Sequence, residues 1–200
     1  MKKIFLIFAV LILSCTKQKN IENKIVDKKI IDSTKNDNAL EEFKKSKYFS
    51  YDKITECKYK VLKDGDKFAY SDLVLYYSYN KSKKIEILPY SLIMVEKHHK
   101  YDYCSNVFEN LLEFYSEVQF ESYYDGKNES LIPYLKNIEL LNTKQKEYAF
   151  YFLNLGAKNN AIGSVAYLEI IKRYGLGMTI NFKQADSLRE VKLHLKKERN

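Results

Sequence analysis

Four glutamates recur at four-residue intervals in the middle of the chain: Glu109, Glu113, Glu117 and Glu121. If this stretch is one helix, residues four apart share a face, so the carboxylates would form an acidic ridge opposite the apolar face. Such a ridge could dock a basic protein partner, because interface charges set specificity and the rate of encounter. The alternative interpretation is a solvated outer helix face that has no partner.

Gly175-Leu176-Gly177 is a second candidate for a functional site, because closely spaced glycines can form a loop that binds a phosphate group. A dinucleotide-binding fingerprint needs a strand before the glycines and a third glycine that opens a helix. Here the preceding pattern is helical and position 180 is isoleucine. The Gly-Lys-Ser/Thr of a phosphate-binding P-loop is also absent. We therefore interpret these glycines as a turn between two helices.

Other motifs of catalysis are missing from the chain. It contains no His-Glu-x-x-His, no Cys-x-x-Cys and no Gly-x-Ser-x-Gly. His98 and His99 are adjacent, and neighbouring residues on a helix do not face each other, so a shared metal is not expected. The sequence thus predicts no enzyme, no catalytic residue, no metal and no cofactor.

The N-terminus has the form of an export signal. Met1-Lys2-Lys3 is positively charged, and the apolar run 4–13 is shorter than the about 20 residues that a spanning helix needs. The next residues, Ile12-Leu13-Ser14-Cys15, resemble the lipobox of bacterial lipoproteins. This resemblance implies cleavage before Cys15 and attachment of lipid to its thiol. An ordinary signal peptide with an incidental cysteine is the alternative.

Lipidation at Cys15 would anchor the protein to a membrane without spanning it, since two or more acyl chains give stable anchoring. Thr16 follows the cysteine, whereas the inner-membrane retention signal of some such lipoproteins is an aspartate. The expected location is the bacterial cell envelope, at the outer membrane facing the periplasm. Two thiols would remain, and whether Cys57 and Cys104 pair or stay free is open.

Composition divides the chain into three parts: a signal peptide at 1–14, a lipidated cysteine with a flexible tether at 15–45, and a domain at 46–200. The stretch 16–40 contains no Phe or Tyr and is rich in Lys, Asn and Asp, so it cannot bury enough surface to fold. As a flexible coil it would reach roughly 25 to 30 Å. The later residues are rich in aromatic side chains and numerous enough for one domain with a core.

The chain is basic, with a formal net charge of +8. Nucleic acid is not an expected partner, because the export signal separates the protein from most of it and the cations form no compact footprint. We interpret the basic C-terminal stretch 191–199 as the last turn of a helix, where cationic side chains interact favourably with the helix dipole. Attraction to anionic lipid headgroups is the alternative there.

The domain is predicted to be all-α. Apolar residues recur at the i, i+3, i+4, i+7 spacing of a helix face in several segments. The clearest sets are Phe108, Leu111, Leu112 and Tyr115; Leu131, Tyr134, Leu135 and Ile138; and Tyr148, Tyr151, Phe152 and Leu155.

A weak internal period suggests helical hairpins. Shifting 61–77 by 34 residues onto 95–111 aligns hydrophobic positions. The aligned pairs are Val61 with Val95, Leu73 with Val107, Val74 with Phe108, and Tyr77 with Leu111. A third hairpin is expected at 154–175.

Residues 175–185 resemble the turn of Sel1-type, tetratricopeptide-like repeats. The matching positions are Gly175, Gly177, Met178, Asn181, Phe182 and Ala185. A glycine can end a helix in the left-handed conformation, an asparagine can cap the next helix, and an alanine permits close helix contact. The family's tyrosine three residues before the first glycine is Lys172 here. The resemblance implies a short α/α helical-hairpin solenoid that binds proteins.

We therefore expect a lipid-anchored envelope adaptor that holds an unidentified protein partner. One alternative is an immunity or inhibitor lipoprotein that neutralises a periplasmic toxin, which differs only in its partner. Another is a cell-wall enzyme, which would need a convergent polar cluster.

Overall fold

The computed structural model describes residues 41–42, 44–46 and 49–198. Within these residues every regular element is a helix and no strand occurs, which confirms the predicted all-α class. None of these helices is long and apolar enough to cross a membrane. The predicted tether, 15–45, extends into the folded unit 41–200, because Glu41, Glu42 and Lys44 are helical. The predicted signal peptide, 1–14, and the predicted lipid attachment site, Cys15, lie outside the described residues.

Seven α-helices, α2, α3, α5, α6, α7, α8 and α9, carry most of the described structure, and short helical segments join them. In chain order the elements are α2 (Tyr51–Asp64), α3 (Lys67–Tyr79), the 3-10 helix η2 (Lys81–Ile87), the short α4 (Leu88–Leu92), the π-helical turn η3 (Ile93–Lys97), η4 (Tyr101–Tyr103), α5 (Cys104–Ser116), η5 (Phe120–Ser122), α6 (Asn128–Leu135), η6 (Lys136–Leu140), α7 (Thr143–Lys158), α8 (Ile162–Tyr174) and α9 (Phe182–Glu198).

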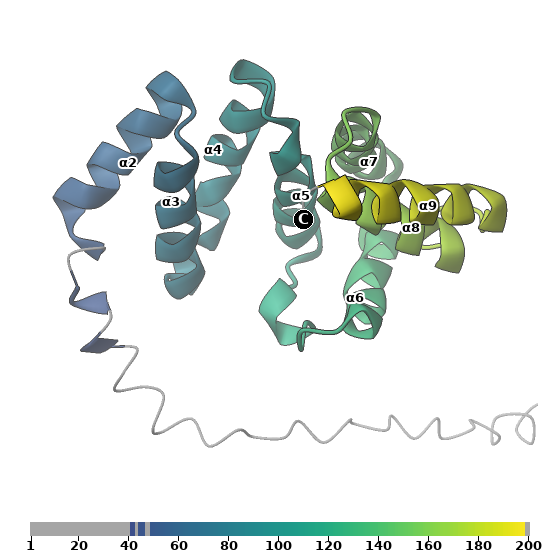
Figure 1. Ribbon diagram of the computed structural model, residues 1–200. Helices are drawn as coiled ribbons and strands as arrows, with labels where there is room; N and C mark the ends of the chain where they lie inside the picture. Colours follow the sequence, from purple (N-terminus) through teal and green to yellow (C-terminus); the bar gives the residue numbers. More distant parts are fainter. Residues whose placement is uncertain (1–40, 43, 47–48, 199–200) are drawn as a thin grey trace, which may run out of the picture. The chain divides into compact units, whose positions relative to one another are not determined.

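Three hairpins are built in the same way: α2 with α3, α4 and η3 with α5, and α7 with α8 (Figure 1). A residue with positive φ separates the two arms of each hairpin: Gly65 (61°), His99 (52°) and Asn160 (58°). The residues after Gly65 and His99 donate backbone hydrogen bonds to carbonyl groups six residues earlier. Asp66 N–H donates to the carbonyl of Lys60, and Lys100 N–H donates to the carbonyl of Met94. These two bonds satisfy carbonyl groups that the ends of the preceding helices would otherwise leave without a partner.

The first two hairpins repeat at an interval of 34 residues. Gly65 and His99 are 34 apart, and five pairs of residues at this interval are buried in both hairpins. The buried pairs are Cys57 with Ser91, Val61 with Val95, Tyr70 with Cys104, Leu73 with Val107, and Tyr77 with Leu111. Of the four hydrophobic pairs aligned in the sequence, only Val74 with Phe108 differs, since Val74 is 36% exposed while Phe108 is fully buried.

The third hairpin follows the second at an interval of 61 residues. Asn160 is 61 residues after His99, and Gly156, Val165 and Leu168 are buried at the positions of Val95, Cys104 and Val107. The longer interval accommodates the segment 117–142, which contains η5, α6 and η6. The regular period is therefore interrupted once by an inserted segment.

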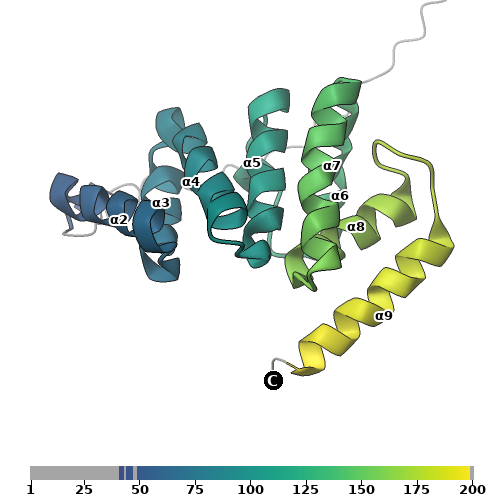
Figure 2. The same ribbon diagram turned by 90° about the horizontal axis from the view of Figure 1, so that it is seen from above.

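The helices form a row in which α2, α3, α4, α5 and α7 follow one another (Figures 1 and 2). α9 packs against α8 at the end of this row. Buried side chains form one core cluster around α2, α3 and α4 and a second around α5, α6, α7 and α8. Each hairpin thus buries its apolar face against its neighbours.

Candidate functional site

The predicted acidic ridge does not form, because α5 ends too early. Its last residue is Ser116, whose hydroxyl donates to the carbonyl of Leu112 at 2.6 Å. Glu117 then takes a positive φ of 57°, and Glu121 lies in the separate helix η5. Only Glu109 and Glu113 share α5, so the prediction of one continuous acidic face is wrong.

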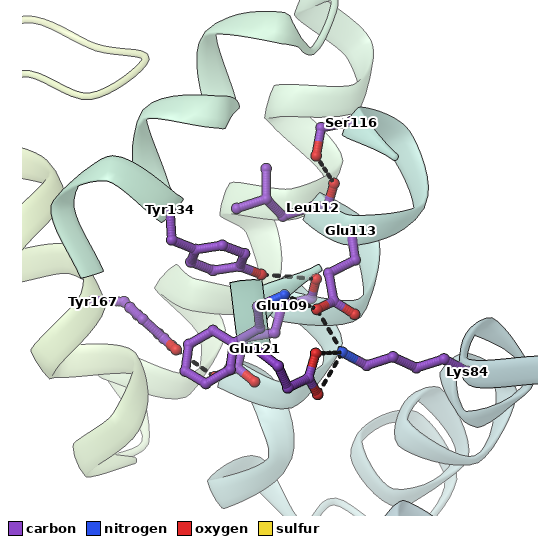
Figure 3. A network of polar contacts seen from close by, with 9 residues as sticks. Lys84, Glu109, Leu112, Glu113, Ser116, Glu121, Tyr134 and Tyr167 are labelled. Carbon is purple, nitrogen blue, oxygen red and sulfur yellow. Dashed lines mark hydrogen bonds and ion pairs between the residues drawn. The ribbon is translucent and has the colours of Figure 1, made fainter. Parts of the chain in front are cut away.

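Lys84 brings Glu113 and Glu121 together instead (Figure 3). The Lys84 ammonium group donates to Glu113 Oε1 at 2.7 Å and to both oxygens of Glu121 at 2.7 and 2.8 Å. Glu113 Oε1 also accepts the backbone N–H of Phe120 at 2.6 Å. These hydrogen bonds and ion pairs join η2 and η5 to α5. Lys84 was not recognised in the sequence, where it lies 29 residues from Glu113.

Glu109 is linked to α6 and α8 at the centre of α5. Its carboxylate accepts a hydrogen bond from the hydroxyl of Tyr167 at 2.5 Å, and its carbonyl accepts one from Tyr134 at 3.3 Å (Figure 3). Burial raises the pKa of the Glu109 carboxyl to about 7. The bond from Tyr167 and the charge of Lys84 oppose that rise, whereas the carboxylate of Glu113 adds to it.

Both tyrosine hydroxyls beside Glu109 stay protonated. Burial raises the pKa of Tyr134 and Tyr167 above the usual range, and the nearby Glu109 carboxylate raises both further. Tyr167 therefore remains a hydrogen-bond donor to Glu109 at any physiological pH. Among Glu109, Tyr134 and Tyr167, only Glu109 therefore changes its charge near neutral pH.

Two cavities meet at Glu109, which contributes to the lining of each. The smaller cavity, of about 190 Å³, lies between α3, η2, α5 and η5. The larger, of about 510 Å³, is an open groove between α5, α6, α8 and α9. The second arms of the hairpins, α3, α5 and α8, thus line a surface that carries both cavities.

The larger cavity, which we call the α5–α9 groove, is lined by both charged and apolar side chains. Glu169 of α8 binds Lys192 of α9, and Arg173 binds Asp186 at 2.9 Å, so ion pairs hold α9 against α8. The groove also contains Arg189 and the ring of Tyr174, which is 51% exposed. Its apolar lining comes from Leu131, Ile132, Ala166 and Ile170.

Gly175-Leu176-Gly177 forms the turn between α8 and α9. Gly175 ends α8 with a φ of 68°, and Gly177 has the same φ. Asn181 Oδ1 accepts the backbone N–H of Gln184 at 3.0 Å, in the position of a cap at the start of α9, and Ala185 is fully buried. A helix precedes the glycines, so the strand that a dinucleotide fingerprint requires is not there.

The two cysteines of the folded unit are buried and unpaired. Cys57 lies in α2 and Cys104 begins α5, and neither forms a disulfide. Burial raises the pKa of both thiols, to about 12 for Cys104, which makes them poor nucleophiles. Among the described residues no cluster of His, Cys, Asp and Glu is arranged to hold a metal ion.

Comparison of the chain with protein-family models, with curated proteins and with solved structures finds no match in any of the three.

Proposed function

We propose that this chain is a lipid-anchored binding protein of a bacterial cell envelope, at the outer membrane facing the periplasm, and that the α5–α9 groove holds a segment of a protein partner. The observation that carries the proposal is the groove itself. It is open, about 510 Å³ in volume, and combines charged walls with an exposed aromatic ring, Tyr174. Exposed aromatic residues beside charged groups are typical of binding hot spots.

The location rests on the N-terminal sequence. Lys2 and Lys3, the apolar run 4–13 and Ile12-Leu13-Ser14-Cys15 support export followed by lipid attachment at Cys15. The stretch 16–40, poor in residues that could form a core, supports a tether that separates the hairpins from the lipid surface. The Sel1-like features of 175–185 support protein binding as the role of the hairpins.

Affinity capture with two matched tyrosine variants tests the proposal. The full chain is extracted from membranes with detergent, and the captured proteins are identified by mass. Tyr174→Ala removes a half-exposed ring from the groove, while Tyr151→Ala removes a ring of similar exposure, 55%, from α7 outside it. We expect a partner that is lost with Tyr174→Ala and kept with Tyr151→Ala. A partner lost equally with both variants, or with neither, would rule out the groove.

The identity of a captured partner separates an adaptor from an immunity protein. An envelope protein encoded elsewhere in the genome would support the adaptor role. A toxin encoded beside this chain, whose activity the purified protein suppresses, would support neutralisation instead.

An enzyme is the second candidate, because the structure does contain a polar cluster in a cavity. Glu109 has a pKa of about 7, the range that suits a general acid or base, and it lines the groove together with Glu129 and Glu169. If the protein cleaves cell-wall polymers, Glu109→Gln should abolish release of soluble fragments from purified cell walls. Fragment release by neither the wild type nor the variant would remove this candidate.

A further inference from the structure

The smaller cavity contains an excess of negative charge. Glu109, Glu113 and Glu121 line it, and Lys84 is the one cation among its lining residues. Lys84 already binds Glu113 and Glu121. The partly buried Glu109 carboxyl accepts one hydrogen bond, from Tyr167, and forms no ion pair among the described residues. Burying a carboxylate without a cation is costly, which leaves Glu109 as the group that a cation would stabilise.

The walls of this cavity suit a cation as well. The rings of Tyr70, Tyr77 and Phe120 line it, and aromatic faces attract ammonium and guanidinium groups. Asn106 and Asn110 add amide groups. At about 190 Å³ the cavity is smaller than the roughly 300 to 1,000 Å³ of most small-molecule sites, so it suits a single long side chain.

Hydrogen bonds fix the wall beside Glu109. The hydroxyl groups of Tyr70 and Ser91 lie 2.8 Å apart, and the Asn110 amide donates to Ser91 Oγ at 2.9 Å. These bonds join α3, α4 and α5. The wall is therefore formed before any ligand enters, which lowers the cost of ordering on binding.

We propose that this cavity binds a lysine or arginine side chain of a protein partner, with the Glu109 carboxylate as its counter-charge. The inference rests on the proposed function, because the side chain would belong to a segment that also occupies the α5–α9 groove. Glu109 lines both spaces, so a segment in the groove and a side chain in the smaller cavity would contact the same residue. A charge-assisted bond to a carboxylate is about twice as strong as a neutral one, so the side chain would select the partner.

Binding should depend on pH, because only the ionised Glu109 attracts a cation. Its pKa is about 7 without a ligand, so the Glu109 carboxyl is mostly neutral at about pH 5.5 and mostly ionised at about pH 8.5. A bound cation would lower that pKa. The titratable groups that face Glu109 from the packed elements are Glu113 of α5, Lys84 of η2, Glu121 of η5, Tyr134 of α6, Tyr167 of α8 and Tyr70 of α3.

Calorimetric titration of the full chain with two capped tripeptides tests the inference. One peptide is acetyl-Ala-Lys-Ala-amide, and the other has uncharged norleucine in place of lysine. At about pH 8.5 we expect the lysine peptide to bind about tenfold more tightly, and at about pH 5.5 we expect that preference to disappear. Equal affinity of the two peptides at the higher pH would overturn the proposal.

Two glutamine variants locate the effect. Glu109→Gln keeps the shape of the side chain and should remove the preference for lysine. Glu117→Gln is the matched control, because Glu117 is exposed and does not line the smaller cavity, and it should keep the preference. Loss of the preference in both variants would contradict the assignment to Glu109.

The titration uses no cellular partner, so its failure differs from that of the proposed function. A captured protein that depends on Tyr174 while the two peptides bind equally would retain the groove and reject the cation site. Lysine-selective binding together with a captured partner that is lost equally with both tyrosine variants, or with neither, would retain the cation site and reject the groove.

Discussion

Gly156 of α7 lies directly against Ser164 of α8. A methyl group on Gly156 would overlap with the Ser164 side chain and would come within 2.7 Å of Cβ of Cys104 in α5. Gly156 occupies the position that Val61 and Val95 occupy in the other two hairpins. The absence of a side chain at Gly156 makes this close approach between α7 and α8 possible.

Gly156→Ala should destabilise the protein by about 1 to 3 kcal/mol, because the added methyl group overpacks the contact between α5, α7 and α8. Alanine has the higher helix propensity, so a stabilising effect would be expected if packing did not matter. Urea unfolding measures the difference. Asn154→Ala, at an exposed position of the same helix, is the control and should change stability by no more than about 0.5 kcal/mol. Equal or higher stability of Gly156→Ala would contradict the close approach.

Glu109 should make the wild-type protein less stable as the pH rises. Folding raises its pKa from 4.5 to about 7, so between these values the folded protein holds a proton that the unfolded chain has lost. The contribution of the protonated carboxyl is complete below about pH 4.5 and is lost as the pH rises through about 7, by up to about 3 kcal/mol.

Urea unfolding of the wild type and of Glu109→Gln between pH 4 and about pH 8.5 measures this contribution. The difference in unfolding free energy between the two proteins should change across that range, since glutamine does not titrate. Glu117→Gln should follow the wild type. Parallel curves for the wild type and Glu109→Gln would show that Glu109 titrates with an ordinary pKa.

Lys84→Met should destabilise the protein by about 3 kcal/mol, because it leaves the largely buried carboxylate of Glu113 without its cation. The neighbouring Lys83 is exposed and has no side-chain contact in this network, so Lys83→Met removes the same charge without the ion pairs. Thermal unfolding of the two variants compares them. Similar melting temperatures would show that the ion pairs of Lys84 contribute little.

Cys15→Ala should stop lipid attachment. The substitution removes both the thiol to be acylated and the residue before which cleavage is expected, so the precursor should keep its apolar N-terminal run. Wild type should partition into detergent and incorporate labelled fatty acid. A chain that begins at residue 16 behind a signal peptide without a lipobox should be found in the soluble periplasmic fraction. Wild-type protein that is soluble and unlabelled would remove the lipoprotein interpretation.

The positions of many helices could be read from local patterns. Phe108, Leu111 and Leu112 face the core of α5 as their spacing predicts, and the pair Val61 and Val95 is buried in both hairpins. Gly175 ends α8 with positive φ, the conformation that glycine adopts at least cost. These features depend on neighbours within a few residues, and the helical period of 3.6 determines which side chains share a face.

The end of α5 was missed because the spacing of Glu109, Glu113, Glu117 and Glu121 fits a longer helix equally well. The chain leaves the helix at Glu117, and Glu113 binds the N–H of Phe120 in the turn that follows. No residue typical of a helix end marks this position in the sequence. Contacts of the inserted segment 117–142 with α5, such as Glu121 with Lys84, accompany the break.

By itself the sequence determined the all-α class, the approximate register of the first two hairpins and the turn after α8, because each follows from apolar spacing or from the conformational preference of glycine. The contacts of Glu109 and Lys84 at the candidate site were decided only by the tertiary structure. Tyr167 meets Glu109 across 58 residues, and Lys84 meets Glu121 across 37. Such distant groups meet only when helices pack. The same packing removes water from Glu109 and raises its pKa, which no local pattern encodes.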